Sequence, residues 1–215
     1  MWVATVSGAW YNVPKNGTGG EIAMPYDKKQ VGDKLIYWRE FMHNFHLPTW
    51  QELPDLELYM DQVVSLVSRY VNLQPHSAPN EQMLTPSAVN NYVRLKLIPP
   101  PVKKRYRREH LAYLIVICCL KSSMSLSSIQ QMFPVGLEQD EVQQIYTNFL
   151  AQYRTAYLTC VQQLEHLALP VLDAEDTTPD CVESLVLTTA VEATLYKLVT
   201  DKLLALQLPD EEDTH

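Results

Sequence analysis

The chain is poor in the residues on which disulfide-bonded and phosphate-binding proteins depend. It has four cysteines, none in a C-x-x-C pair, which argues against a disulfide framework and favours a reducing compartment. Six glycines in 215 residues leave little room for a glycine-rich phosphate loop, and the sequence contains no nucleophile elbow and no H-E-x-x-H motif. We therefore expect a protein that is not an enzyme and that needs no cofactor.

No apolar run has the length of a membrane span. The longest, residues 111–120, has ten residues, whereas a spanning helix needs about 20. The first twenty residues lack the basic flank and the continuous apolar stretch of a signal peptide. Because 47% of the residues are apolar, a sizeable core can form, and we expect a soluble, cytoplasmic protein.

Negative charge prevails overall, yet positive charge is concentrated in one segment. The net charge is −8, but residues 94–108 contain seven of the seventeen basic residues and no acid, so this segment is +7 and the rest is −15. At physiological salt, charges more than about 8 Å apart are largely screened, so the local sign matters more than the total. The seven residues are Arg94, Lys96, Lys103, Lys104, Arg105, Arg107 and Arg108.

Apolar residues recur at helical spacing through most of the chain, which predicts a mainly α fold. Asp27, the pair Thr85 and Pro86, and Ser125 are suited to begin helices. Residues 1–26 indicate an irregular arm, Pro170 is expected to begin a polar loop, and residues 209–215 form an acidic tail. Helices are expected over residues 27–46, 56–70, 85–97, 110–121 and 126–133, from beyond Gly136 past Leu164, and over 182–206.

The helix expected at residues 85–97 has two different faces. On a helical wheel Val89, Tyr92, Val93 and Leu97 share one side, which predicts burial. The other side is polar, and the three prolines at 99–101 then favour an extended segment through VKKRYRR. The polar side consists of Ser87, Asn91 and Arg94, flanked by Asn90.

Three strings of this sequence resemble the MerR-type winged helix-turn-helix. They are VNNYVRLKLIPP, KKRYRREHLAYLIVICCLK and SLSSIQQMF. The resemblance implies a mainly α fold: a MerR-like winged helix-turn-helix with an N-terminal helical extension and two C-terminal helices. It also places Lys96 where that family has glycine, which implies a strained, positive φ. Arg107 stands where a Ser or Asp commonly caps the next helix.

The strings LPDLELYMDQV, NNYVRLKLIPPPVKKRY and REHLAYLIVICCLK more closely resemble domain-of-unknown-function family 1836, an uncharacterised bacterial group. This similarity covers about residues 50–165 and implies no particular activity. Combined with the MerR resemblance, it predicts four regions. They are an N-terminal arm and helix (1–48), a winged helix-turn-helix (49–135), a C-terminal helical region (136–208) and an acidic tail (209–215).

A function in transcription regulation follows as a hypothesis, with double-stranded DNA as the partner. Cations neutralise phosphate, and short polar side chains reach base edges. We expect the basic extended segment to bind phosphates and the polar helix face to enter the major groove. The predicted DNA-binding residues are Ser87, Asn90, Asn91, Arg94, Lys96, Lys103, Lys104, Arg105, Arg107 and Arg108.

Other interpretations of the same residues remain open. The basic run can be a solvated surface, and Asn90 and Asn91 can be ordinary exposed residues. The fold can instead serve as an interaction module that meets an acidic partner and does not bind DNA. The two C-terminal helices can form a homodimer or fold back on their own core. His43 and His46 lack a third ligand, so no metal site is expected, and no effector pocket can be assigned.

Overall fold

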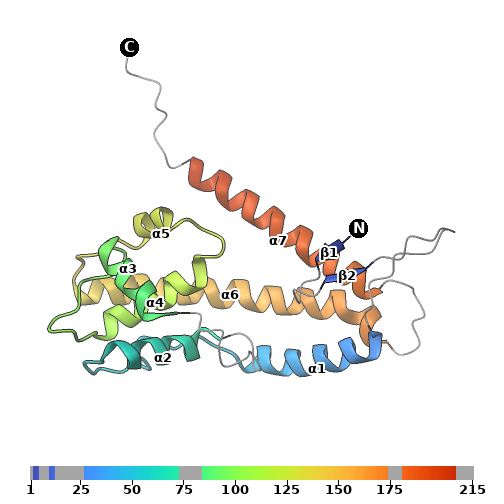
Figure 1. Ribbon diagram of the computed structural model, residues 1–215, viewed down its shortest axis with the longest axis horizontal. Helices are drawn as coiled ribbons and strands as arrows, with labels where there is room; N and C mark the ends of the chain where they lie inside the picture. The colour runs from blue at the N-terminus through green and yellow to red at the C-terminus, as the bar shows by residue number, and fades with distance from the viewer. Residues whose placement is uncertain (1, 5–9, 13–26, 73–83, 174–180, 207–215) are drawn as a thin grey trace, which may run out of the picture.

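The computed structural model describes residues 2–4, 10–12, 27–72, 84–173 and 181–206. Within these ranges most residues are helical, so the prediction of a mainly α fold is confirmed (Figure 1). The elements are β1 (Trp2–Ala4), β2 (Trp10–Asn12), α1 (Lys28–Asn44), α2 (Met60–Tyr70), α3 (Pro86–Arg94), α4 (Arg108–Leu120), α5 (Leu126–Met132), α6 (Gln139–Leu172) and α7 (Cys181–Ala205).

Helix α6 is the axis of the molecule. It has 34 residues, and both α1 and α4 pack against it. In Figure 1, α1 and α2 follow one another along the same side of α6, with α1 beside its C-terminal part. Helix α7 leaves that end and runs back at an angle to α6, so that much of its length stands away from the body.

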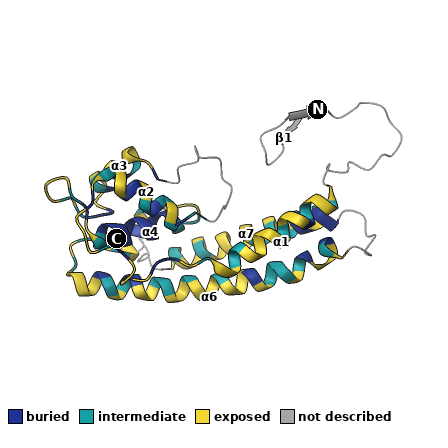
Figure 2. Cartoon of the chain, turned by 90° about the horizontal axis from the view of Figure 1, so that it is seen from below, coloured by how far each residue is buried: buried dark blue, intermediate teal, exposed yellow. Residues whose placement is uncertain are grey.

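The first core surrounds α4. From Leu111 onwards this helix is apolar on all sides, and Leu111, Leu114, Ile115 and Ile117 are at most 1% exposed. Side chains from α2, α3, α5 and the N-terminal part of α6 enclose it. Figure 2 accordingly shows α4 in the colour of buried residues, and the prediction that this segment is a buried helix is confirmed.

A second, smaller core lies at the other end of α6. Ala168 and Val171 of α6 pack there against Val182 and Leu185 at the beginning of α7. Val31 and other apolar residues of α1 cover them. Helix α1 is thus held to the C-terminal end of α6 and not to the first core alone.

The predicted helix starts are confirmed by their hydrogen bonds. Asp27 Oδ1 accepts from the Gln30 amide at 3.1 Å. Thr85 Oγ1 accepts from the Ala88 amide, also at 3.1 Å, and Pro86 occupies the first helical position, where its missing N–H is no loss. Ser125 caps α5 in the same way through the Ser128 amide.

The structure corrects the expected irregular arm at residues 2–4 and 10–12. These two segments pair as antiparallel strands, with Val3 opposite Tyr11. Both are rich in aromatic and β-branched residues, which favour extended backbone. The rest of the arm lies outside the described residues, as do the acidic tail and most of the loop before α7.

Three helix boundaries also differ from expectation. Helix α2 begins at Met60, four residues after Leu56, because Leu58 is engaged in a backbone pair described below. Helix α3 ends at Arg94 and not near Leu97. Helix α6 continues through Pro170 to Leu172. A proline in the last turn removes only one amide bond, so the helix need not stop there.

Candidate nucleic-acid interface

Helix α3 presents the predicted polar face to solvent. Val89 and Tyr92 are buried against the first core, and burial raises the pKa of the Tyr92 hydroxyl. On the opposite side Arg94 donates to Asn91 Oδ1 at 2.7 Å, which holds both side chains in place. Ser87, Asn90 and Arg94 are exposed, and Asn91 is half-buried.

A lysine occupies the left-handed position that ends α3. The Lys96 amide donates to the Val93 carbonyl at 3.0 Å and the Leu97 amide donates to the Tyr92 carbonyl at 2.9 Å, which is the Schellman pattern. The pattern needs a positive φ at the residue usually filled by glycine, and Lys96 has φ 55°. The strained backbone implied by the MerR resemblance is therefore found.

The basic segment turns back on itself at Lys103 and Lys104. Val102 and Arg105 exchange two backbone hydrogen bonds, of 3.1 and 2.9 Å, across these two residues. Lys103 has φ 50° and Lys104 has φ 63°, as a type I′ turn requires. We call residues 102–105 the lysine turn. Asn-Gly is the usual choice for such a turn, and two lysines are an unfavourable one.

The lysine turn is tied to the segment before α2. Leu58 and Tyr106 exchange backbone hydrogen bonds of 2.8 and 2.9 Å. Each pair is an isolated bridge, and no regular strand is found between residues 99 and 107. The extended backbone expected after the prolines is present, whereas the strands of a wing are not.

Some of the predicted cations contact other side chains of the protein. The guanidinium of Arg105 lies 3.5 Å from the centroid of the Tyr59 ring. Arg107 donates to Glu57 at 3.0 Å. Neither Glu57 nor Tyr59 was expected here, because both stand about fifty residues earlier in the chain and carry no local signal.

Arg108 is largely enclosed by the surrounding chain. Its side chain is 17% exposed, it donates to the Leu53 carbonyl at 3.0 Å, and it lies 3.8 Å from Asp55. It holds the loop before α2 against the first core. In contrast, Lys96, Lys103 and Lys104 are exposed, and within the described residues they have no acidic or aromatic partner.

A scan against protein families matches the model described as Domain of unknown function (DUF1836) to residues 48–155. This match covers half of the chain. The chain belongs to this family. No curated protein and no solved structure shows significant similarity to this chain.

The DUF1836 region corresponds closely to the first core. It begins in the loop before α2 and ends within α6 after Tyr153, the last residue that packs against that core. All ten predicted DNA-binding residues lie inside it, whereas α1 and α7 lie outside it.

His110 supports the start of α4 beside Tyr106. Its Nδ1 accepts from the Arg107 amide at 3.0 Å, as the N3 side chain does in a capping box, whereas the bond that a Ser or Asp side chain would accept at position 107 is absent. The ring is buried and meets Tyr106 edge-on, with centroids 5.4 Å apart. Burial lowers the pKa of His110, although the nearby Glu109 and the Pro100 carbonyl oppose the shift.

A second surface of interest follows α7. Its first turns contact the second core, and Glu192 accepts from Gln163 of α6 at 2.7 Å. On another face, apolar side chains between 48% and 81% exposed recur at helical spacing. We call this face the α7 stripe. Its members are Leu187, Val191, Leu195, Leu198, Val199 and Leu206.

The described residues contain neither a metal-binding cluster nor a membrane-spanning helix. No three His, Cys, Asp or Glu side chains come close enough there to hold a metal ion. His43 instead contacts Glu165 of α6 at 2.9 Å. Among the described helices, none combines the length and the hydropathy needed to cross a membrane.

Proposed function

We propose that the chain is a cytoplasmic transcription regulator that binds double-stranded DNA through a MerR-like winged helix-turn-helix. In this proposal α2 and α3 form the helix-turn-helix, α3 enters the major groove, and the lysine turn takes the place of the wing. The alternative, an interaction module that meets an acidic partner, uses the same surface.

The observation that carries the proposal is the identity of the strained residues. In the described part of the chain, three residues other than glycine have a positive φ, and all three are exposed lysines. Each such residue costs about 1 kcal/mol relative to glycine. No ion pair within the described residues offsets this strain, because Lys96, Lys103 and Lys104 have no acidic partner there. An anion outside the chain explains why a cation stands at each position.

Because Arg105, Arg107 and Arg108 already contact other side chains, the basic residues differ in their proposed roles at DNA. The three exposed lysines are the primary phosphate contacts, since they can neutralise phosphate without breaking an internal bond. Arg107 binds phosphate only if it leaves Glu57, and Arg108 positions the loop before α2. Arg105 is stacked on Tyr59 and adds its positive charge to the proposed DNA-binding surface.

The polar face of α3 is assigned to base recognition. Ser87, Asn90 and Arg94 are exposed along it, and asparagine and arginine are suited to adenine and guanine edges respectively. Asn91 is bonded to Arg94, so it orients the guanidinium rather than reaching a base by itself.

We further propose that the active species is a homodimer joined through the α7 stripe. Six exposed apolar side chains along α7 and directly after it amount to an area on the order of 500 Å², and an exposed apolar patch of this size is often an interaction site. A stripe on one helix is self-complementary about a two-fold axis, and a dimer matches a two-fold DNA site.

The test replaces the lysine turn by the sequence that this turn prefers. K103N/K104G keeps the type I′ geometry and removes two charges, so the fold should become slightly more stable while DNA binding weakens. We expect the slope of log affinity against log salt to fall by about 2, measured by fluorescence anisotropy on labelled genomic fragments.

The matched control is K34Q/K202Q, which removes two exposed lysines from α1 and α7 and therefore changes the net charge equally. Its affinity should stay within about twofold of the wild type. An equal loss in both double variants assigns binding to overall charge and contradicts the proposal. A wild-type chain that fails to bind DNA even at low salt favours the interaction module.

A further inference from the structure

The C-terminal end of α3 is held by a side chain from α5. Gln130 Nε2 donates to the Lys96 carbonyl at 3.1 Å and to the Leu95 carbonyl at 3.3 Å. These two residues directly follow Arg94, the last residue of α3. Carbonyl groups at the end of a helix lack partners within the helix, so a donor from another element stabilises that end. Gln130 supplies this donor from a position 34 residues after Lys96.

The two hydrogen bonds fall at a strained residue. Lys96 has φ 55°, a conformation that the Schellman pattern requires and that a residue with a side chain disfavours. The next residues, Leu97 and Ile98, are 3% and 1% exposed, so the chain has to turn at Lys96 in order to bury them. Because Gln130 binds the carbonyl of the strained residue itself, it opposes relaxation of Lys96 to a more favourable φ.

Gln130 can hold this turn because α5 is itself fixed in place. Its neighbour Ile129 is 1% exposed and belongs to the first core. Ser125 caps the start of α5, and Phe133 at its end meets Phe149 of α6 edge-on, with ring centroids 6.0 Å apart. Helix α5 has no basic residue. It therefore adds no cation to the surface beside α3, but it fixes the backbone of one.

The Lys96 side chain is exposed at the end of the helix that we assign to the major groove. The backbone conformation at residue 96 sets the direction in which this side chain leaves the chain. We propose that Gln130 is a positioning residue for DNA binding: it holds Lys96 in the left-handed conformation from which the ammonium reaches a phosphate. The inference rests on the proposed function and deepens it, because it gives α5 a role in the interface.

The test measures DNA affinity for four chains: the wild type, Q130M, K96Q and K96Q/Q130M. Methionine is a good helix former of similar length, but it cannot donate to the two carbonyls. K96Q removes one phosphate contact, so affinity should fall about fivefold and the slope of log affinity against log salt should fall by about 0.9. Q130M should weaken binding about threefold, because Lys96 is no longer held in place. The double variant should bind like K96Q in fluorescence anisotropy on labelled genomic fragments.

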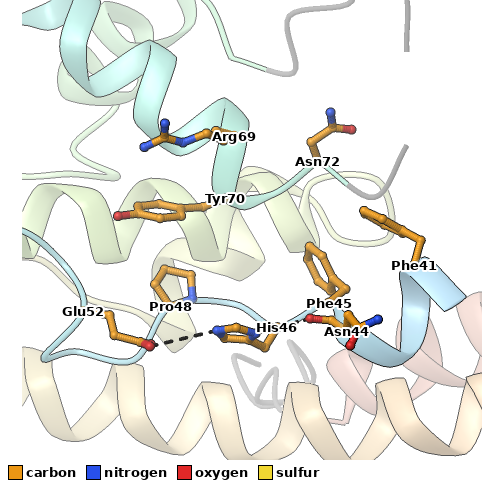
Figure 3. Close-up of a pocket in the computed structure, with 9 residues that line it drawn as sticks. All are labelled: Phe41, Asn44, Phe45, His46, Pro48, Glu52, Arg69, Tyr70 and Asn72. Atoms are coloured by element: carbon orange, nitrogen blue, oxygen red, sulfur yellow. Dashed lines mark hydrogen bonds and ion pairs between the residues drawn. The ribbon is translucent and has the colours of Figure 1, made fainter. Parts of the chain in front are cut away.

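Two control variants accompany these four chains. Q131M changes the same residue type at an exposed position of α5 and should bind like the wild type. R69Q removes one positive charge, as K96Q does, but from a different surface. Arg69 lines a hollow of about 410 Å³ between α1 and the end of α2, and neither α3 nor the lysine turn contributes a described residue to it (Figure 3). Its affinity should stay within about twofold of the wild type.

The four affinities separate positioning from a general loss of structure. If Q130M weakens binding equally in the presence and in the absence of Lys96, Gln130 supports the fold of α3 and does not act through Lys96. That result contradicts the proposal. The proposal is also wrong if Q130M binds DNA like the wild type, or if R69Q loses as much affinity as K96Q.

Hydrogen exchange tests the contact without DNA. The amides of Lys96 and Leu97 donate to the carbonyls of Val93 and Tyr92 and thereby close the turn. Q130M should speed the exchange of both amides about fivefold, because the turn loses its support.

Replacing the strained lysine by glycine should rescue this variant. In K96G/Q130M the Leu97 amide should regain most of its protection, since glycine adopts a positive φ without strain. Unchanged exchange in Q130M, or no rescue by K96G, overturns the proposal. A chain that binds no DNA contradicts the proposed function, whereas these exchange rates decide by themselves whether Gln130 holds Lys96.

Discussion

Helices α4 and α7 have similar amino-acid character and opposite surroundings. Both are rich in aliphatic residues, α4 in Leu and Ile and α7 in Leu and Val, and both are apolar over more than one face. In α4 every residue from His110 to Cys118 is buried, whereas in α7 only Cys181, Val182 and Leu185 are. Among the described residues, side chains enclose α4 completely, whereas they cover only the first turns of α7. The proposed homodimer would account for this difference, because a second copy would cover the exposed part of α7.

The same substitution in the two helices should show the largest contrast. Leu114 in α4 is fully buried, and Leu114→Ala should lower the free energy of unfolding by about 3 kcal/mol, because it removes apolar contacts and leaves a cavity. Leu187 in α7 is 66% exposed, and Leu187→Ala should change the same quantity by less than about 0.5 kcal/mol. Urea denaturation of dilute protein measures both. Equal losses would show that α7 is as well packed as α4.

A change of pH should produce a smaller effect that is confined to the α4 region. Burial lowers the pKa of His110, so the folded chain holds the neutral ring while the unfolded chain takes up a proton below about pH 6.5. The stability that depends on neutral His110 is thus present above that pH and is lost as the pH falls towards the lower folded pKa.

H110Q provides the comparison for this pH effect. Glutamine at this position can still accept from the Arg107 amide, as in an ordinary capping box, but it does not titrate. Thermal unfolding between pH 7 and pH 5 should show a steeper loss for the wild type than for H110Q. Parallel curves would mean that His110 contributes nothing to the acid sensitivity of the fold.

Polar substitution of the α7 stripe should have the least effect on the single chain and a clear one on association. L195Q/L198Q replaces two exposed leucines that touch neither core, so the helical signal in circular dichroism should be unchanged. Light scattering at micromolar concentration should give twice the 24.7 kDa of the chain for the wild type and 24.7 kDa for the variant. L185Q, in the second core, should instead lose stability. A wild type that is strictly monomeric contradicts the dimer.

Much of the fold was predictable because the signals for it are local. Asp27, Thr85 and Ser125 cap their helices through amides three residues away, and the continuous apolar run at residues 111–120, which makes up most of α4, predicts burial. The boundaries that were missed depend on distant contacts. Met60 begins α2 because Leu58 is held by Tyr106, nearly fifty residues later.

The candidate interface was predictable in composition but not in arrangement. The run of cations and the polar face of α3 follow from residue type and period. That Arg107 and Arg108 meet Glu57 and Asp55 does not, because a pair of charges fifty residues apart leaves no periodic trace. The division into engaged arginines and exposed lysines therefore emerged only when the chain was folded.

The sequence by itself determined the helices, the buried α4 and the position of the basic segment, since backbone propensity, capping and hydrophobic period act over a few residues. The tertiary structure decided which cations remain available, which face of α7 is uncovered and where a hollow opens between α1 and α2. Each of these depends on how segments distant in the chain meet, and that is set by the packing of the two cores along α6.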